Sequence, residues 1–511
     1  MGKGAVAPVR LTYAPGGVWF WDLCPVVPGL GVPRMSHGGR RAAKVTAMSQ
    51  PLANPPCREG VTVLSLRHRP RTSTVIAIGT ALSLSACGLL DGSESSASPV
   101  ASVAPADQTQ ISMAVWGGFG LDELIAEYES AHPDVAINLL SGDYNPLHDS
   151  LQRQLVAGTG APTIAAIGED YITKFAAQPE QFVDLTTLGA GDYQDVYLPW
   201  KWAQGTSPDG TAIIGMGADV SGLALCYRSD LFAAAGLPTD RLEVSGAMAD
   251  SWEGFLELGT QYSAESGGAA FIDNAATLLT PIRNQTGASY YDASGALTVE
   301  TAKPAFDIAN KAIGSGISAG YTQFSDAWDK GLSDGSFAVT LCPVWGMGYI
   351  QGVVTESNYQ PKWDMADIPG PGGSWGGSFY TIPAQGTTEQ QTAAWEFLRW
   401  LLAPAQQLKN FQATGSLPSQ PAVYKDSSVK GYEIEFFNNA PVGDILAKAV
   451  QELPVATSHD PRNGSVEAVM AQVLSGVQAG DISSGDAWQV ALEAAKLVDS
   501  SNGAPSPSPT P

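Results

Sequence analysis

The sequence offers few residues that could form a catalytic nucleophile. Gly372–Gly376 matches the GxSxG pattern, which places a nucleophilic serine between a strand and a helix. Here Pro369 and Pro371 precede the pattern, and the strand-like run Ser378–Pro383 comes after it, so the required context is missing. Only three of the 5 histidines follow residue 87, namely His132, His148 and His459. A Ser-His-Asp hydrolase is therefore disfavoured.

Carboxylates are the more abundant reactive groups. A glycosidase would need two of them about 5–10 Å apart across the scissile bond. All but 2 of the 50 acidic residues follow residue 86, so the sequence leaves such a pair open, although no two acids stand out in a context that would raise a pKa. HExxH, Walker A and zinc-finger patterns are absent. No CxxC or Cys/His cluster suggests a metal site, and no cofactor is expected.

Two of the 5 cysteines, Cys226 and Cys342, lie in strand-like runs of the main body. In an exported chain of this size they could form one disulfide, or they could remain buried free thiols. Both alternatives stay open at the level of sequence.

Residues Arg67–Cys87 have the features of an export signal. Arginines at 67, 69 and 71 precede the apolar run Thr74–Leu84, which has the length of a signal-peptide core. This run is too short to span the roughly 30 Å of hydrocarbon in a bilayer. The segment Leu84–Cys87 resembles the lipobox of bacterial lipoproteins, and a plain secretory peptide is the alternative. The resemblance implies a lipidated Cys87 that anchors the protein to the cell membrane on its extracytoplasmic side.

The composition divides the chain into five parts. Signal peptides are normally N-terminal, so we expect residues 1–66 to be a mis-annotated start, with the true start nearer Met48 or around 61–64. A disordered cytoplasmic leader is the alternative. The parts are 1–66, the doubtful leader; 67–87, the signal peptide; 88–108, a Ser/Ala/Pro linker; 109–499, the body; and 500–511, a disordered tail.

The net charge is strongly negative once the first 86 residues are removed. These residues hold 10 of the 27 Lys and Arg and 2 of the 50 Asp and Glu, which leaves 17 basic against 48 acidic residues. The resulting charge of −31 argues against nucleic acid or anionic lipid as a partner. The body of about 390 residues is too long for one core and predicts two lobes.

Strand and helix patterns alternate through the body. Gln110–Val115 and Val135–Leu140 are predicted strands, and Leu121–His132 between them has apolar residues at helical spacing. A helix at Leu147–Ala157, a strand at Thr163–Ile167 and a helix from Tyr171 continue the order, which is typical of a parallel, doubly wound sheet. Similar units recur later; they are predicted at Gly222–Tyr227, Ser229–Ala235, Trp252–Ser263, Pro304–Gly314, Phe337–Leu341, Thr387–Leu402, Asp444–Leu453, Ser465–Ala479 and Ser484–Val498. Because strands and helices mix throughout, two interleaved α/β lobes are favoured over two consecutive domains.

Several longer segments then occur in a familiar order over Thr109–Asp499. They are ISMAVWGG, AHPDVAINL, LQRQLVAGTGAPTIAAIGEDYITKFAAQ, SGLALCYRSDLFAAAGLP, SWEGFLELGTQY, GSFAVTLCPVWGMGYI, GGSWGGSFYTIPAQGTTEQQTAAWEFLRWLLAPAQQ and TGSLPSQPAVY. Together they resemble the extracellular solute-binding proteins of carbohydrate ABC transporters (family 1), the family that includes maltose-binding protein. Thr163 departs from the pattern, where the family often has Asp.

The resemblance implies a periplasmic-binding-protein-like fold of type II, in which two α/β lobes joined by hinge strands close on a sugar in the cleft between them. Lobe 1 would comprise 109–218 plus 363–412, and lobe 2 would comprise 219–362 plus 413–499. Chain crossings are expected near Gly217–Ser221 and Gln360–Asp364, with a further return near Gln412–Leu417.

The resemblance also implies which residues bind ligand. Trp116, Asp170, Trp345, Trp375 and Asp219 follow predicted strands or lie in crossing segments, and ligands of open α/β sheets bind beyond the carboxyl ends of strands. Tyr144, Asp143, Trp200, Trp202 and Trp328 are weaker candidates. Aromatic rings can cover the C–H faces of a sugar, while carboxylates bind its hydroxyl edges. The ordinary alternatives are core packing for a tryptophan and helix capping for an acid.

The interpretation is therefore a monomeric, lipid-anchored binding protein without enzymatic activity. It would capture a mono- or oligosaccharide outside the membrane and deliver it to the permease of an ABC transporter. The alternatives are a binding protein for a non-sugar solute such as a polyamine, or a secreted glycosidase. Lys and Arg are scarce near the candidate residues, which disfavours an anionic ligand.

Overall fold

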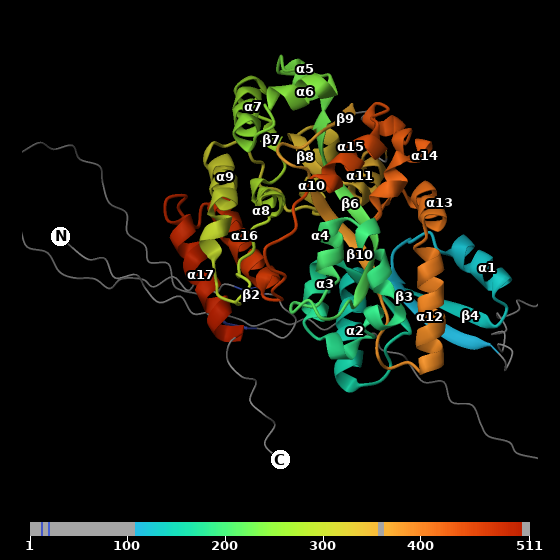
Figure 1. The fold of residues 1–511 in the computed structure, drawn as a ribbon. Helices are drawn as coiled ribbons and strands as arrows, with labels where there is room; N and C mark the ends of the chain where they lie inside the picture. Colours follow the sequence, from blue (N-terminus) through green and yellow to red (C-terminus); the bar gives the residue numbers. More distant parts are fainter. Residues whose placement is uncertain (1–11, 14–18, 21–107, 356–361, 503–511) are drawn as a thin grey trace, which may run out of the picture. The chain divides into compact units, whose positions relative to one another are not determined.

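The computed structural model of the protein describes residues 12–13, 19–20, 108–355 and 362–502 (Figure 1). The chain divides into two compact units, Met1–Ser96 and Ala97–Pro511. In the first unit, β1 (Thr12–Tyr13) and β2 (Trp19–Phe20) form an antiparallel pair. The signal segment with Cys87, nearly all of the leader and linker, most of the tail and the start of the Gln360–Asp364 crossing lie outside the described residues. The second unit contains every other described element.

A nine-stranded sheet with the order β4-β3-β5-β10-β6-β8-β7 forms the centre of the second unit, and β9 and β11 also pair with β6. Its first part contains three mutually parallel strands, as the sequence predicts: β3 (Thr109–Trp116), β4 (Val135–Gly142) and β5 (Ile164–Gly168). The parallel arrangement predicted from this order does not extend to the rest of the sheet. β10 (Ser374–Thr381) runs antiparallel to both β5 and β6, so the sheet is mixed.

One long strand joins the two lobes. In β6 (Gly215–Arg228), residues up to Gly222 pair with β10, and residues from Leu223 pair with β8 (Phe337–Pro343). The first predicted crossing, Gly217–Ser221, lies within this strand. β9 (Trp363–Ala366) pairs with the second half of β6, on the edge opposite β8. β11 (Leu417–Pro418) pairs with β6 at Val220 and Asp219.

Helices cover the sheet of each lobe. Those associated with the first lobe are α1 (Asp122–Ala131), α2 (Tyr144–Ala157), α3 (Glu169–Ala176), α4 (Pro199–Gln204), α12 (Thr388–Leu401) and α13 (Pro404–Thr414). The second lobe also contains β7 (Ala270–Ile272), which is parallel to β8. Its helices are α5 (Ser229–Ala234), α6 (Arg241–Ala247), α7 (Trp252–Glu265), α8 (Leu279–Thr286), α9 (Lys303–Gly314), α10 (Asp326–Asp334), α11 (Val344–Thr355), α14 (Ser427–Lys430), α15 (Val442–Gln451), α16 (Asn463–Ala479) and α17 (Ala487–Asn502).

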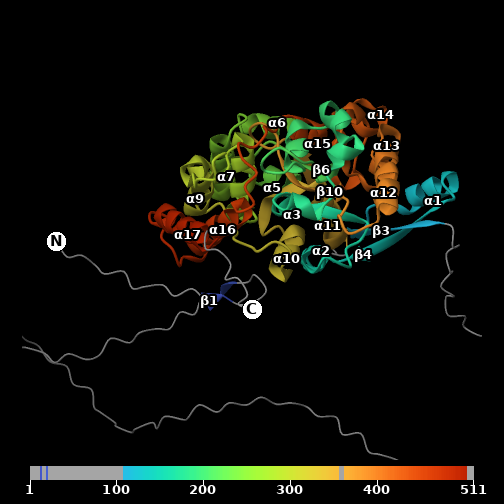
Figure 2. The ribbon, with the colours of Figure 1, turned by 60° about the horizontal axis from the view of Figure 1, so that its bottom comes forward.

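Figures 1 and 2 show α1 and β4 at one end of this unit and α9, α16 and α17 at the other, with β6 and β10 between them. Separate buried apolar clusters fill the two ends, one around β3 and α12 and another around α7, α9 and α16. The fold class expected from the sequence, two interleaved α/β lobes joined by hinge strands, is confirmed. None of the helices in the described ranges has the length and apolar character that crossing a bilayer requires.

Local sequence explains where several helices begin. Ser251 accepts a hydrogen bond from Gly254 N and caps α7, as its position predicts. Thr387 and Gln390 form a reciprocal capping box at α12. α5 begins at Ser229, where the predicted segment Ser229–Ala235 also begins. α3 begins at Glu169, two residues earlier than predicted, which brings Asp170 into its first turn.

Candidate ligand-binding site

The first lobe contributes a group of aromatic side chains where β3 ends. Trp116, the last residue of β3, makes edge-on contacts with Tyr144 of α2, at 4.9 Å between ring centroids, and with Phe119, at 5.0 Å. Both Trp116 and Tyr144 are half-buried. Asp143 precedes α2, is exposed and makes no capping hydrogen bond. The structure thus brings Trp116 and Tyr144 together, as expected.

A buried histidine fixes this aromatic group to the end of β5. His148 Nε2 lies 2.9 Å from the donating Gly168 N, and its Nδ1 lies 2.7 Å from the Tyr144 carbonyl oxygen. Because a backbone N–H can only donate, Nε2 accepts and Nδ1 carries the proton, so the ring is neutral. Burial lowers the pKa of His148 accordingly. The ring also stacks on Tyr171 with centroids 4.1 Å apart.

Acidic groups follow directly after β5, in the first turn of α3. Asp170 is exposed, whereas the Glu169 side chain is 13% exposed and its Oε2 lies 3.8 Å from Lys201 Nζ. Burial raises the pKa of Glu169 and lowers that of Lys201, and each charge partly offsets the shift of the other. Gln204 Nε2 donates to Glu169 Oε1 at 3.2 Å. Sequence reasoning selected Asp170 but missed Glu169 and Lys201.

The Lys201 side chain packs against the two hinge strands, β6 and β10. Its side chain is fully buried, and Nζ stands 3.9 Å from the centre of the Phe379 ring of β10 without a hydrogen-bond partner among the described residues. Asp219 of β6 is half-buried and accepts a hydrogen bond from the Ser378 hydroxyl. Trp200 and Trp202, which flank Lys201 in the sequence, were both predicted as weaker candidates. Nothing in the sequence distinguished the lysine between them.

Gly377 lets the hinge strands approach each other at this point. Its φ of +110° is open to glycine, and a Cβ there would lie 2.7 Å from the Asp219 carbonyl oxygen and 3.0 Å from Lys201 Nζ. Any side chain would push these groups apart. The glycine-rich run before Ser378 is therefore a requirement of hinge packing.

The second lobe contributes an exposed aromatic pair. Trp345, in the first turn of α11, is 45% exposed, and its Nε1 donates to the Trp375 carbonyl oxygen at 2.9 Å. Phe324, 51% exposed, stacks against Trp345 with centroids 6.0 Å apart and 29° between the planes. Phe324 also has a φ of +64°, a strained conformation for a bulky residue. Sequence reasoning missed Phe324, because nothing in its local pattern indicates a positive φ.

Two of the weaker candidates are core residues. Trp328 is 3% exposed, and its Nε1 donates to Asp273 Oδ2 at 2.8 Å. Trp200 is 5% exposed, and its Nε1 donates to the Val450 carbonyl oxygen at 2.8 Å. Their rings are therefore engaged within the protein. Trp202 is half-buried and packs against Tyr197.

The selected residues form one row across neighbouring strands. Tyr144 contacts Gly168: a Cβ added at Gly168 would lie 2.0 Å from the Tyr144 hydroxyl oxygen. Gly168 in turn is paired with Ser378 in the sheet. Ser378 binds Asp219, and in the same strand a Cβ at Gly376 would lie 3.0 Å from Trp345 Nε1. The row thus runs from the aromatic group of the first lobe, past the acids, to the aromatic pair of the second. That these residues bind ligand stays a prediction.

A small polar cavity lies beside this row, between the lobes. Its volume is about 50 Å³, and its lining includes Glu169 and Gln204 from the first lobe and Arg283 and His459 from the second. Glu169 Oε2, Gln204 Oε1 and His459 Nε2 are buried without hydrogen-bond partners in the described structure. Arg283 is held by Glu467, with Nε 2.7 Å from Oε2. Such a space suits a few water molecules.

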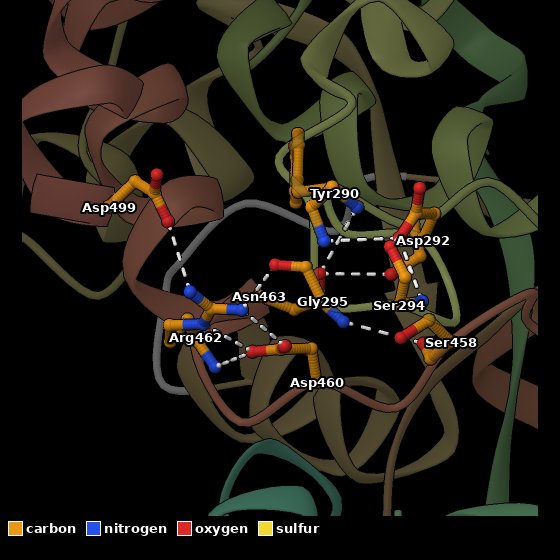
Figure 3. A network of polar contacts seen from close by, with 11 residues as sticks. Tyr290, Asp292, Ser294, Gly295, Ser458, Asp460, Arg462, Asn463 and Asp499 are labelled. Carbon is orange, nitrogen blue, oxygen red and sulfur yellow. Dashed lines mark hydrogen bonds and ion pairs between the residues drawn. The ribbon is translucent and has the colours of Figure 1, made fainter. Parts of the chain in front are cut away.

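A separate polar network joins several segments of the second lobe (Figure 3). Arg462 donates to Asp460, to Asp499 of α17 at 3.0 Å and to the Gly295 carbonyl oxygen at 2.8 Å. Its guanidinium carbon lies 3.8 Å from the centre of the Tyr291 ring. The network joins the start of α16 to α17 and to the loop at Gly295, so its role is structural.

Comparison with known proteins gives concordant results. The model of the family described as bacterial extracellular solute-binding protein matches residues 123–437. The arabinooligosaccharide-binding protein of Bacillus subtilis (strain 168) is 25% identical over 239 residues, 44% of this chain and 52% of the relative. The chain thus matches about half the length of that curated relative.

Solved structures match over more of the chain. An extracellular solute-binding protein of family 1 is 36% identical, with a TM-score of 0.72 over 76% of this chain and 99% of that chain. The sugar-binding protein MalE from Xanthomonas citri is 18% identical, with a TM-score of 0.62 over 77% of this chain and 98% of that chain. The cyclic alpha-maltosyl-1,6-maltose binding protein from Arthrobacter globiformis is 20% identical, with a TM-score of 0.60 over 76% and 99%. The last two likenesses concern the fold.

Proposed function

This chain belongs to the bacterial extracellular solute-binding proteins, and we propose that it is the substrate-binding component of an ABC importer for a mono- or oligosaccharide. In this role it captures the sugar outside the membrane and delivers it to a membrane permease. The family membership agrees with the resemblance seen in the sequence. Beyond family membership, the proposal states that the ligand is a carbohydrate.

The proposal rests mainly on the row of candidate residues, in which aromatic rings lie at both ends and acidic side chains lie between them. Trp116 and Tyr144 stand at one end, and Trp345 and Phe324 are exposed at the other, with Asp219 between them. A sugar ring has apolar C–H faces and hydroxyl edges, so it needs this combination. Each well-placed buried polar contact contributes about 1–3 kcal/mol to discrimination.

The relatives support the same class of ligand. The curated relative is named for arabinooligosaccharides, and two of the structural relatives are named as sugar- or maltosyl-maltose-binding proteins. Another structure of the same fold, from Mycobacterium tuberculosis, is described in complex with glycerophosphocholine at 17% identity. A phosphodiester would need a free cation in the site, but Arg283 is paired with Glu467 and Lys201 is fully buried. A carbohydrate is therefore favoured.

We propose binding without catalysis. Glu169, whose pKa is raised by burial, is held between Lys201 and Gln204 at the hinge. A general acid must reach the scissile bond with its proton, and Glu169 would have to leave these partners to do so.

The extracytoplasmic location and the anchor complete the proposal. The basic residues, apolar run and lipobox-like segment before Cys87 support lipidation of that cysteine, and a monomer held at the membrane fits the family. Mass spectrometry of the protein from its native membrane should find a lipidated Cys87 at the N-terminus. A Cys87→Ser variant should appear in the soluble fraction; a membrane-bound variant would contradict the anchor.

A thermal-shift screen of the purified protein tests the function. The panel contains mono- and oligosaccharides, polyamines and glycerophosphodiesters. Ligand at about 100 times its dissociation constant should add roughly 2.7 kcal/mol of stability, which raises the melting temperature by a few degrees. A shift with one sugar class, with the sugar intact after overnight incubation, supports the proposal. A shift with polyamines alone points to the second solute class, and a consumed sugar points to a glycosidase.

A further inference from the structure

The disulfide lies close to the most exposed tryptophan of the candidate site. The structure joins Cys226 of β6 to Cys342 of β8. Both cysteines are completely buried, and Cys342 precedes Trp345 by three residues. Between them, β8 ends at Pro343 and α11 begins at Val344. The disulfide therefore links β6 to the last residues of β8, and β8 leads directly into the helix that contains Trp345.

The disulfide also lies in the layer on which the helix carrying Trp345 is packed. The same buried cluster contains the two cysteines and, from α11, Met347 and Ile350. Trp328, whose ring lies 5.3 Å from that of Phe324, belongs to this cluster as well. Displacement of β8 relative to β6 would therefore move α11 and with it the exposed aromatic pair.

Trp345 is only partly enclosed by the protein. The residue is 45% exposed, its Nε1 donates to the Trp375 carbonyl oxygen, and its ring meets that of Trp375 edge-on, with centroids 6.0 Å apart. Its stacking partner Phe324 is 51% exposed. In the sheet, the last rungs before α11 pair Cys342 with Ala224 and Pro343 with Leu223. Since proline has no N–H to donate, this end of the ladder depends on few hydrogen bonds.

We propose that the Cys226–Cys342 disulfide is a positioning element of the binding site, which sets the place and orientation of the Trp345 ring for the ligand. The inference rests on the proposed function and goes beyond it, because it assigns a covalent bond of the second lobe to ligand affinity as well as to stability. A ring that is held in its bound orientation loses less freedom on binding, and this preorganisation appears as affinity.

The test is a double-mutant cycle on the full chain with the carbohydrate identified by the thermal-shift screen. Replacing both cysteines, Cys226→Ala with Cys342→Ala, should weaken binding about three- to tenfold, the range expected for freeing one side chain. In a Trp345→Leu background, which keeps an apolar side chain but no flat ring, the same replacement should change affinity little. Affinity is measured by calorimetry well below the melting temperature. If the alanine pair does not fold, Cys226→Val with Cys342→Ala keeps more of the core volume.

Arg462→Met serves as the matched control. It removes the network of Figure 3 in the same lobe and should lower the melting temperature while leaving affinity unchanged. Unchanged affinity in the cysteine-free protein, with only a lower melting temperature, would overturn the inference. An equal loss in the wild-type and Trp345→Leu backgrounds would do the same, because the effect would then not pass through the ring. If the wild-type protein bound no carbohydrate at all, the proposed function would fail, and the inference with it.

Discussion

At the scale of single residues, exposure separates tryptophans that can meet a ligand from those that hold the core. Trp345 is 45% exposed, whereas Trp328 and Trp200 are buried and donate their N–H groups within the protein. The sequence offered all three as candidates, Trp345 because it follows a predicted strand and Trp328 and Trp200 as weaker ones. It could not rank them by exposure, because exposure depends on the packing of α10 and α15, which are distant in the chain.

Trp345→Ala should strongly weaken carbohydrate binding without unfolding the protein. Loss of an exposed aromatic platform at a binding site costs about 2 kcal/mol or more, roughly 30-fold in affinity. The melting temperature should change little, because the ring makes few buried contacts. Calorimetry and thermal unfolding measure the two effects separately.

Trp488→Ala is the control for this variant. Trp488 packs on Phe306 of α9, outside the row of candidate residues. Its loss should lower stability while affinity remains that of the wild type. Equal affinities of the Trp345→Ala variant and the wild-type protein would mean that the ligand binds elsewhere.

His148 makes stability depend on pH in a defined direction. Its pKa is lowered in the folded protein by burial, whereas in the unfolded chain it is near the ordinary 6.5. The unfolded state therefore binds more protons below this value, so the contribution of His148 is fully present above about pH 6.5 and is lost as pH falls through the folded pKa. Urea unfolding between pH 8 and pH 5 should show the loss.

Other groups also make the unfolding free energy depend on pH, so the part due to His148 must be measured with variants. His459 also has a lowered pKa, and Glu169 has a raised pKa, which changes the unfolding free energy with pH in the opposite direction. A His148→Asn variant should have a smaller decrease in unfolding free energy between pH 7 and pH 5 than the wild type. A His459→Asn variant should retain the His148 part of the decrease. An unaltered slope in the His148→Asn variant would show that this ring is not the titrating group.

At the scale of elements, local pattern predicted the strands and most helices of the first lobe. Gln110–Val115 and Thr163–Ile167 fall within or overlap β3 and β5, and Leu121–His132 and Leu147–Ala157 overlap α1 and α2. The long β6 was only half predicted, at Gly222–Tyr227. Its first half contains Gly215 and Gly217, which weaken a strand pattern, and it is held by pairing with β10, more than 150 residues later. Such pairing has no local signal.

The glycine-rich hinge offers a test of this long-range pairing. Gly377→Ala would place a Cβ 2.7 Å from the Asp219 carbonyl oxygen at a φ of +110°. We expect a loss of about 1–3 kcal/mol in unfolding free energy, the usual cost of strain at such a position, and weaker binding because Asp219 and Lys201 would move apart. Gly348→Ala is the matched control. It lies in α11 with no atom within 4 Å of the added Cβ, so it should leave affinity unaltered and raise stability by about 0.5–1 kcal/mol.

At the scale of the whole molecule, the row of candidate residues draws on both lobes, so its geometry depends on how the lobes meet. Trp116, Tyr144 and Asp170 belong to the first lobe, and Trp345 and Phe324 to the second. The sequence supplied all of these except Phe324 through a resemblance and through strand ends, but it could not supply Glu169 and Lys201. Their significance comes from burial at the junction, which only the packing of α3 and α4 against β6 and β10 creates.

If the ligand contacts both ends of this row, it should favour a closed arrangement of the lobes. A ligand shifts the equilibrium between open and closed arrangements only by its different affinity for the two. Closure therefore requires that the ligand contact residues of both lobes. Small-angle X-ray scattering of the wild-type protein should show a smaller radius of gyration when the bound carbohydrate is added at saturation. With ligand at about three times the wild-type dissociation constant, the wild-type protein should already contract. The Trp345→Ala variant, with roughly 30-fold weaker affinity, should then keep a radius close to that of the ligand-free protein. If the wild-type radius is unchanged while calorimetry shows saturation, the sugar binds to one lobe alone, and the row does not act as a single site.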